Sequence, residues 1–146
     1  LHSIPQDCYI LYLWQNENTI VAGRNQNIFA QCNVRLAGEE EVRIARRLSG
    51  GGTVFHDLGN LNYTFFSRAP YFSRTLNTNI IVSALASCGV MAQVSGRNDI
   101  LVKNKKVSGN AYYNLGDRYY HHGTLLINSD LDRMGRLLRV DAEKWK

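Results

Sequence analysis

Residues 46–57 contain the part of this sequence that is best suited to chemistry. Two arginines precede three consecutive glycines, and a histidine and an aspartate follow a short apolar run. Glycine has no Cβ and adopts positive φ readily, so successive backbone N–H groups can converge on an anion. Side chains such as Arg46 and Arg47 can then clamp that anion. The segment therefore predicts a phosphate-binding loop.

The simplest alternative is an ordinary turn, because glycine marks turns of every kind. A turn, however, needs neither two adjacent arginines before it nor His56 and Asp57 after it. Other phosphate loops do not fit, since the Walker pattern ends in Gly-Lys-Ser/Thr and the dinucleotide pattern opens a helix. Here residues 53–55 are Thr-Val-Phe, which favours a strand.

Lys106 is the second candidate for chemistry. Lys103, Lys105 and Lys106 fall within four positions, and solvated surface charge is the ordinary interpretation of Lys103 and Lys105. Lys106 begins an apolar strand of small residues, and alternation places it on the opposite face from Lys105 and Val107. A lysine beside a phosphate loop can stabilise charge on an α-phosphate or on a carboxylate that attacks it.

The histidines and aspartates allow a weaker prediction of a metal site. His121 and His122 are adjacent in a strand-like run, so at most one of them faces a site, and a zinc set is poorly supported. Magnesium prefers carboxylates together with phosphate oxygens. Asp99 and Asp57 are the candidate ligands, with Asp99 assigned as the metal ligand. Structural roles are the alternative for Asp57, Asp99 and His56.

Composition limits the class of protein. The 146 residues, 45% hydrophobic and 20% charged, indicate one globular domain with a sizeable core. No apolar run is long enough to predict a membrane-spanning helix. The net charge of +5 suits nucleic acid, nucleotide phosphates or an acidic protein equally well. The three cysteines show no metal spacing and are odd in number, which favours a reducing compartment.

Periodicity predicts an α/β (α+β) protein with mixed, largely antiparallel sheets flanked by helices. Residues 9–14 and 19–23 are expected to form a hairpin, and 53–56 and 61–67 two strands joined by a turn. Further strands are expected at 42–46, 90–94, 99–102, 106–113 and 118–128, and helices at 34–41, 76–88 and 131–138. The 76–88 helix has an apolar face that includes Cys88.

Four blocks of residues, in their order and spacing, resemble the lipoate–protein ligase A family of the biotin/lipoyl ligase-like fold. The blocks are 46–60, with Arg-Arg-x-Ser-Gly-Gly-Gly-x-Val-x-His-Asp-x-Gly-Asn, then Gly-Arg-Asn-Asp at 96–99, Lys-x-Ser-Gly at 106–109 and His-His-Gly-Thr-Leu-Leu at 121–126. One block would be weak evidence, but four in order are strong. The similarity runs from about residue 11 to the end.

The resemblance implies an enzyme that joins lipoate to ATP, giving lipoyl-AMP and pyrophosphate, and then transfers the lipoyl group to a lysine of a lipoyl domain. ATP and Mg²⁺ are the implied cofactors. The matching ATP contacts are Arg47, Gly52, Thr53, Val54, Phe55 and Lys106. Lys106, the expected catalytic residue, meets both the lipoate carboxyl and the α-phosphate. The apolar lipoyl tail needs a slot, which Gly51, His121 and Gly123 are expected to line.

The implied partners are lipoyl domains of 2-oxoacid dehydrogenase complexes and the glycine-cleavage H protein, with no nucleic acid and no membrane. The expected location is the cytoplasm, with the mitochondrial matrix or another organelle as the alternative. Residues 1–146 are expected to be a single catalytic-domain fragment, because the family's N-terminal strand and helix and its later C-terminal segments have no counterpart in this sequence.

Two other functions remain open from the sequence. A transferase would use preformed lipoyl-AMP or move an acyl group between carrier proteins, and the second version generally needs a cysteine nucleophile. A non-catalytic module would bind nucleotide or nucleic acid through its basic surface.

Overall fold

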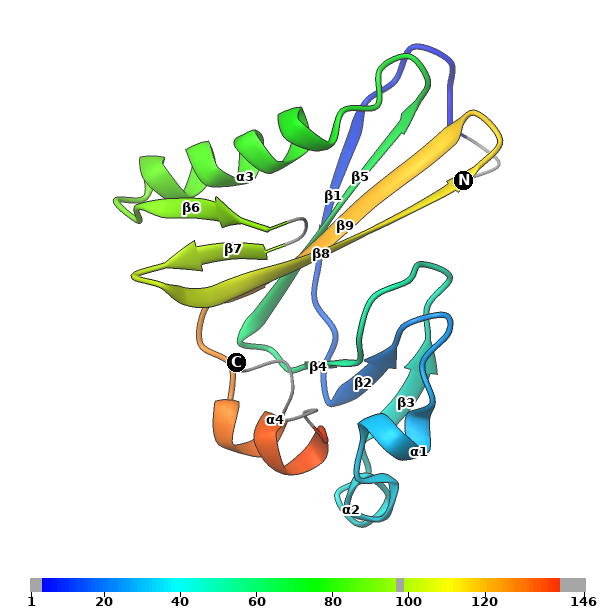
Figure 1. The fold of residues 1–146 in the computed structure, drawn as a ribbon, viewed down its shortest axis with the longest axis vertical. Helices are drawn as coiled ribbons and strands as arrows, with labels where there is room; N and C mark the ends of the chain where they lie inside the picture. The colour runs from blue at the N-terminus through cyan, green and yellow to red at the C-terminus, as the bar shows by residue number, and fades with distance from the viewer. Residues whose placement is uncertain (1–3, 97–98, 140–146) are drawn as a thin grey trace. The chain divides into compact units, whose positions relative to one another are not determined.

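The structure is a computed structural model that describes residues 4–96 and 99–139. It forms two compact units, each discontinuous in sequence. The large-sheet unit comprises Leu1–Trp14 and Leu61–Leu126, and the small-sheet unit comprises Gln15–Asn60 and Ile127–Lys146. Figure 1 labels the strands and helices of each unit. Positions 97 and 98 of the second sequence block lie outside the described residues.

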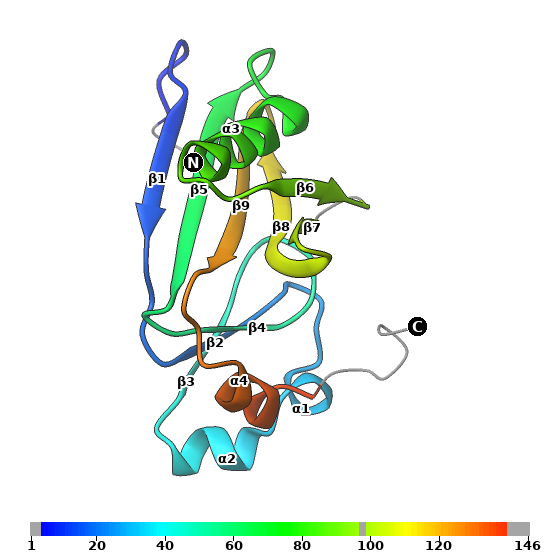
Figure 2. The same ribbon diagram turned by 90° about the vertical axis from the view of Figure 1, so that its left-hand side faces the viewer.

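The large-sheet unit is built on a six-stranded sheet with strand order β1-β5-β9-β8-β7-β6. The pairs β1/β5, β6/β7, β7/β8 and β8/β9 are antiparallel. Helix α3 lies along one side of the sheet (Figure 1, Figure 2), over a core that contains Tyr63, Phe65, Ile81 and Ile100. The elements are β1 (Ile10–Trp14), β5 (Asn60–Arg68), α3 (Arg74–Ser87), β6 (Ala92–Ser95), β7 (Asp99–Val102), β8 (Lys105–Leu115) and β9 (Arg118–Leu126).

The small-sheet unit has a three-stranded sheet with strand order β3-β2-β4. Strand β2 is parallel to β3 and antiparallel to β4, so the protein as a whole has the mixed, largely antiparallel sheets that the sequence predicts. Its core combines residues from all parts of the unit, including Ile20, Cys32, Phe55 and Leu137. The elements are β2 (Thr19–Ala22), α1 (Ile28–Gln31), α2 (Val34–Glu39), β3 (Arg43–Arg46), β4 (Val54–His56) and α4 (Leu131–Leu137).

The expected pairing of strands was wrong in two places. Residues 9–14 and 19–23 contain strands β1 and β2, but β1 pairs with β5 in the large sheet and β2 with β3 and β4 in the small one. The strands expected at 53–56 and 61–67 also exist and lie in different sheets. All four residues of β2 are buried, which is typical of a central strand with a neighbour on each side.

Helix α3 confirms the helix expected at residues 76–88, but only part of the expected apolar face is buried. Ile81 is buried, whereas Leu76 and Cys88 are exposed, so the prediction that Cys88 faces the core was wrong. Asn77 and Thr78 are buried instead, and each side chain makes a hydrogen bond. Asn77 Oδ1 accepts from the Tyr9 hydroxyl, and the Thr78 hydroxyl donates to the Arg74 carbonyl.

The helices of the protein are short, and α3, the longest in the described residues, spans 14 residues. None of the helices in residues 4–96 and 99–139 is long and apolar enough to cross a membrane.

Candidate active site

The glycine loop of the small-sheet unit is organised by Arg47. Its guanidinium donates to the Val21 carbonyl at 2.9 Å, the Gly50 carbonyl at 2.8 Å and the Gly52 carbonyl at 2.7 Å. In a planar trans peptide the N–H of the next residue points away from the carbonyl. The amides of Gly51 and Thr53 are therefore turned away from the guanidinium. Gly51 has φ +91°, a conformation that favours glycine.

The two arginines thus hold the loop as well as supplying charge. Arg46 donates to the carbonyls of Gly23, Arg24 and Gln26 at 2.8–3.1 Å, which fastens the loop that follows β2. A direct contact from Arg47 to ATP stays a prediction. Strand β4 begins just after the loop and lies at an edge of the small sheet, so backbone groups of Val54–His56 are not all used by the sheet. This arrangement suits the backbone contacts expected from Gly52 to Phe55.

Gly23 lies directly against the backbone of the glycine loop at Gly51, a role that the sequence did not reveal. A methyl group added at Gly23 would lie 2.0 Å from the carbonyl oxygen of Gly51 and 3.2 Å from a terminal nitrogen of Arg47. The backbone of the two segments is also joined by a bond from the Arg24 N–H to the Ser49 carbonyl at 2.9 Å. In the sequence, Gly23 is marked as the glycine that ends the strand expected at 19–23.

His56 is buried and neutral at physiological pH. Its side chain is 3% exposed, and Asn16 Nδ2 lies 3.2 Å from His56 Nδ1. Burial, with a further contribution from the charge of Arg47, lowers the pKa of His56 to about 4, although the charge of Asp57 opposes the shift. The imidazole is therefore part of the support of the loop rather than a cationic contact for phosphate.

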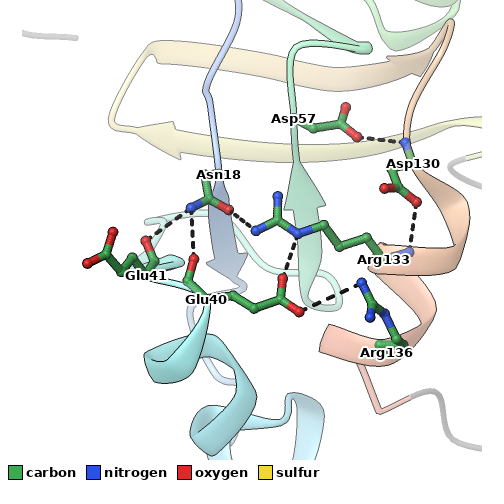
Figure 3. Close-up of polar contacts among 7 residues, drawn as sticks. All are labelled: Asn18, Glu40, Glu41, Asp57, Asp130, Arg133 and Arg136. Carbon is green, nitrogen blue, oxygen red and sulfur yellow. Dashed lines mark hydrogen bonds and ion pairs between the residues drawn. The ribbon is translucent and has the colours of Figure 1, made fainter.

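Asp57 has a structural role. Its Oδ1 accepts from the Gly59 N–H at 2.9 Å, and its Oδ2 accepts from the Asp130 N–H at 2.8 Å (Figure 3). Both carboxylate oxygens are therefore occupied by backbone donors. The geometry does not favour Asp57 as a magnesium ligand, and it supports the alternative that Asp57 fixes the turn after β4 to the start of α4.

Arg133 of helix α4 makes further contacts at the same end of the small sheet (Figure 3). Arg133 Nε donates to Glu40 Oε2 and a terminal nitrogen donates to Asn18 Oδ1, both at 2.7 Å. The guanidinium carbon also lies 5.4 Å from the centre of the Phe55 ring. Strand β4, which carries the expected ATP contacts Val54 and Phe55, thus contacts helix α4 through Arg133.

The Asp57→Ala variant is expected to lower the free energy of unfolding by about 1–2 kcal/mol, because two backbone N–H groups lose their acceptor. Asp57→Asn keeps one acceptor oxygen and should lose about half as much. Urea denaturation measures both effects, with Glu17→Ala as a control on an exposed side chain of the same unit. Equal stability of the Asp57→Ala and Glu17→Ala variants would contradict the role of Asp57.

In the large-sheet unit, Lys106 lies on an irregular part of strand β8. Lys106 is opposite Leu101 and Ser108 is opposite Ile100, so Val107 is an extra residue that forms a β-bulge. Val107 packs against the core, as Lys106 extends over Gly109. Lys106 Nζ lies 2.8 Å from Asp99 Oδ1, and the Lys106 side chain is 57% exposed. The ammonium group is thus oriented yet accessible.

Asp99 is the remaining candidate for the magnesium ligand. Its Oδ1 lies 2.8 Å from Lys106 Nζ. The residues that the structure describes contain no group of three or more His, Cys, Asp or Glu side chains able to hold a metal. One carboxylate fits magnesium only where phosphate oxygens and water supply the other ligands. The assignment of Asp99 stays a prediction.

His121 and Gly123 are both buried, so they do not line an open slot for the lipoyl tail. His121 is fully buried, and its Nε2 lies 2.7 Å from Asn110 Oδ1, which also accepts from the Tyr63 hydroxyl. A methyl group at Gly123 would lie 2.3 Å from that hydroxyl. Burial is the main reason why the pKa of His121 falls to about 3, and the charges of His122 and Arg74 lower it further.

This placement does not support His121 as a lining residue of an acyl slot. His122 is the better candidate, because successive strand residues point to opposite faces of a sheet. It is half-buried and pairs across the ladder with Ala111. The sequence indicated that at most one of the two histidines faces a site, and the burial of His121 favours His122 as that residue.

The two buried histidines should make the folded protein less stable as the pH falls. Both pKa values lie below the ordinary 6.5 in the folded state, so below pH 6.5 the unfolded chain takes up protons that the folded chain does not. The stabilisation is fully present above pH 6.5 and declines as pH falls towards 4. Its size is on the order of 3 kcal/mol for His56.

Urea denaturation of the protein between pH 7.5 and 4.5 measures this effect. The His56→Gln variant should show a shallower decline than the wild type, because glutamine does not titrate. An unchanged slope in that variant would contradict the buried, neutral state of His56.

The family model of the lipoyl protein ligase A/B catalytic domain matches residues 1–146. LipL1 of P. falciparum, solved in complex with lipoate, is 40% identical with a TM-score of 0.85, over 89% of this chain and 39% of that one. A bipartite lipoate protein ligase of Thermoplasma acidophilum, described with its E2 lipoyl domain, is 26% identical with a TM-score of 0.85, over 99% and 59%.

A lipoate-protein ligase A bound with ATP, 23% identical with a TM-score of 0.88 over 99% of this chain and 64% of that one, shows the same fold. The chain spans less than two thirds of the length of each of these three proteins. The resemblance found in the sequence is confirmed by the match of the family model to the whole chain and by the likeness to LipL1. The chain belongs to the family of lipoyl protein ligase A/B catalytic domains.

Proposed function

We propose that the full-length protein is an ATP-dependent lipoate–protein ligase. The observation that carries the proposal is the glycine loop, in which Arg47 gathers the carbonyls of Gly50 and Gly52 and turns the adjacent amides outward. Such amides bind phosphate oxygens. Family membership supports lipoate as the acid that is activated, and LipL1, the relative at 40% identity, was solved with lipoate.

In the first step, a carboxylate oxygen of lipoate attacks the α-phosphorus of ATP. The new bond is an acyl–phosphate O–P bond, and the bond from the α-phosphorus to the bridging oxygen breaks, so pyrophosphate leaves. The loop amides hold phosphate oxygens, and Lys106 stabilises the negative charge that approaches and develops at the α-phosphate. A bound Mg²⁺ would neutralise charge on pyrophosphate, and Asp99 is the residue that would hold it.

In the second step, the amine of an acceptor lysine attacks the carbonyl carbon of lipoyl-AMP. AMP leaves, an amide forms and the amine gives up a proton to solvent. No protein nucleophile is needed. Cys32 is buried with its thiol on the Ile28 carbonyl, Cys8 is half-buried, and Cys88 is exposed at the C-terminal end of helix α3. The acyl-carrier version of the transferase, which generally needs a cysteine near the site, is the less favoured alternative.

The acceptors that we propose are lipoyl domains of 2-oxoacid dehydrogenase complexes and the glycine-cleavage H protein. The archaeal relative, which was described with its E2 lipoyl domain, supports the first of these. Mass spectrometry of each acceptor after incubation with protein, lipoate and ATP tests the proposal. Modification of one lysine in the acceptor is the expected result.

Release of pyrophosphate separates the ligase from the transferase. The full-length protein should release pyrophosphate when both lipoate and ATP are present and none when either is omitted. A transferase that uses preformed lipoyl-AMP would modify the acceptor from lipoyl-AMP and release no pyrophosphate from ATP. That second result, with a correctly folded protein, would overturn the ATP-dependent first step.

A further inference from the structure

Strand β8 changes its pairing partner at Gly109. Residues 110–115 pair with β9, where Asn110 is opposite Gly123, and residues 105–109 pair with β7, where Gly109 is opposite Asp99. Backbone N–H groups at such a transition need an acceptor other than the ladder they have left. Gly109 finds it in a side chain, because its N–H donates to the Thr124 hydroxyl oxygen at 3.3 Å.

The side chain of Lys106 passes over Gly109. A methyl group at Gly109 would lie 3.5 Å from Lys106 Cε and 3.6 Å from Nζ, which is ordinary van der Waals contact. The ammonium group ends 2.8 Å from Asp99, the residue opposite Gly109 in the sheet. The direction of the Lys106 side chain therefore depends on where the Gly109 peptide lies.

The bulge at Val107 makes this dependence stronger. Bulged strands have fewer ladder hydrogen bonds and a stronger local twist, so the segment from Lys106 to Gly109 is held less firmly than a regular strand. The Thr124 hydroxyl then supplies a contact from β9 at the Gly109 end of the segment, next to the pair of Asn110 and Gly123. Asp99 fixes the ammonium end.

We propose that Thr124 is a positioning residue for Lys106. Its hydroxyl holds the Gly109 amide so that Lys106 keeps the orientation in which its ammonium meets the reacting groups. The proposal rests on the proposed function, because it assigns Thr124 a part in lipoate activation. It does not require Thr124 to touch either substrate.

Kinetics of the full-length protein test the proposal. Thr124→Val keeps the size of the side chain but removes the acceptor, and it should lower kcat for pyrophosphate release by about 10- to 100-fold, with KM for ATP and lipoate within about twofold. Thr124→Ser keeps the hydroxyl and should restore most of the rate. Thr78→Val, which removes a buried hydroxyl bonded to the Arg74 carbonyl in the same unit, is the matched control and should leave kcat within about twofold.

A readout that does not need activity keeps the two proposals separate. Reductive ¹³C-methylation gives each lysine an NMR signal, and Lys106 can be assigned with the Lys106→Arg variant. In the wild type the Lys106 signal should differ from those of the exposed Lys103 and Lys105, and in Thr124→Val it should move towards them. Thr78→Val should leave it in place.

The outcomes are distinguishable. If the wild type releases no pyrophosphate, the proposed function fails, and the NMR comparison still tests the link between Thr124 and Lys106. A wild-type rate in Thr124→Val, or a Thr124→Ser variant as slow as Thr124→Val, would overturn the inference, as would an unmoved Lys106 signal.

Discussion

Lys106→Ala is expected to slow lipoate-dependent pyrophosphate release by roughly 10²- to 10³-fold, the usual loss when one preorganised electrostatic contact to a transition state is removed. Lys106 is suited to this role because its ammonium is oriented by Asp99 and Gly109 and remains 57% exposed. Lys106→Met, which keeps an apolar stem of similar length, should be nearly as slow. Coupled detection of pyrophosphate in the full-length protein measures the rate.

Lys105→Ala is the matched control, because Lys105 is the adjacent exposed lysine of the same strand. It should keep near-normal activity. The Lys106–Asp99 pair is partly exposed, so its loss should change the free energy of unfolding by less than about 1 kcal/mol. A Lys106→Ala variant that turns over at the wild-type rate would remove Lys106 from the mechanism.

Gly23→Ala is expected to have the second large effect, on nucleotide binding. The added methyl group would lie 2.0 Å from the Gly51 carbonyl oxygen, so the glycine loop or the end of β2 has to move. Strain of about 1–3 kcal/mol is typical of such overpacking, and 1.4 kcal/mol corresponds to a tenfold change in affinity. We expect ATP to bind about 10- to 100-fold more weakly, as measured by calorimetry.

Gly38→Ala provides a sharp control for this change. Gly38 lies in helix α2 of the same unit, and a methyl group there would meet no atom within 4 Å. Alanine is a better helix former than glycine, so this variant should bind ATP normally and be stabilised by up to about 1 kcal/mol. Equal ATP affinity of the Gly23→Ala and Gly38→Ala variants would show that Gly23 does not support the loop.

Local patterns in the sequence predicted most strands and three helices, because alternation and helical periodicity are local properties. They did not predict which strands pair, since pairing depends on burial shared between distant segments. Strands β1 and β2, separated by four residues, belong to different sheets. The inward face of α3 was also beyond local reasoning, because periodicity does not reveal the partners of the buried Asn77 and Thr78 side chains, the Tyr9 hydroxyl and the Arg74 carbonyl.

The candidate site was predictable to a similar degree. The glycine loop and Lys106 were proposed as site residues from residue types, and their contacts with substrates stay predictions. The supporting residues were not. Gly23 matters only through its distance from Gly51, and Thr124 only through its bond to Gly109. The choice between His121 and His122 required knowledge of which face of the sheet is covered.

The contacts of Arg133 with Glu40 and Asn18 join residues that are 93 and 115 positions apart in the chain. On the ribosome, the small-sheet unit begins to emerge early but lacks α4 until residues beyond 127 have been translated. Of the 146 residues, those that belong to the large-sheet unit have all emerged once residue 126 is outside the ribosome. Vectorial synthesis therefore allows the strand that carries Lys106 to fold first, and the glycine loop acquires its final support only when α4 arrives.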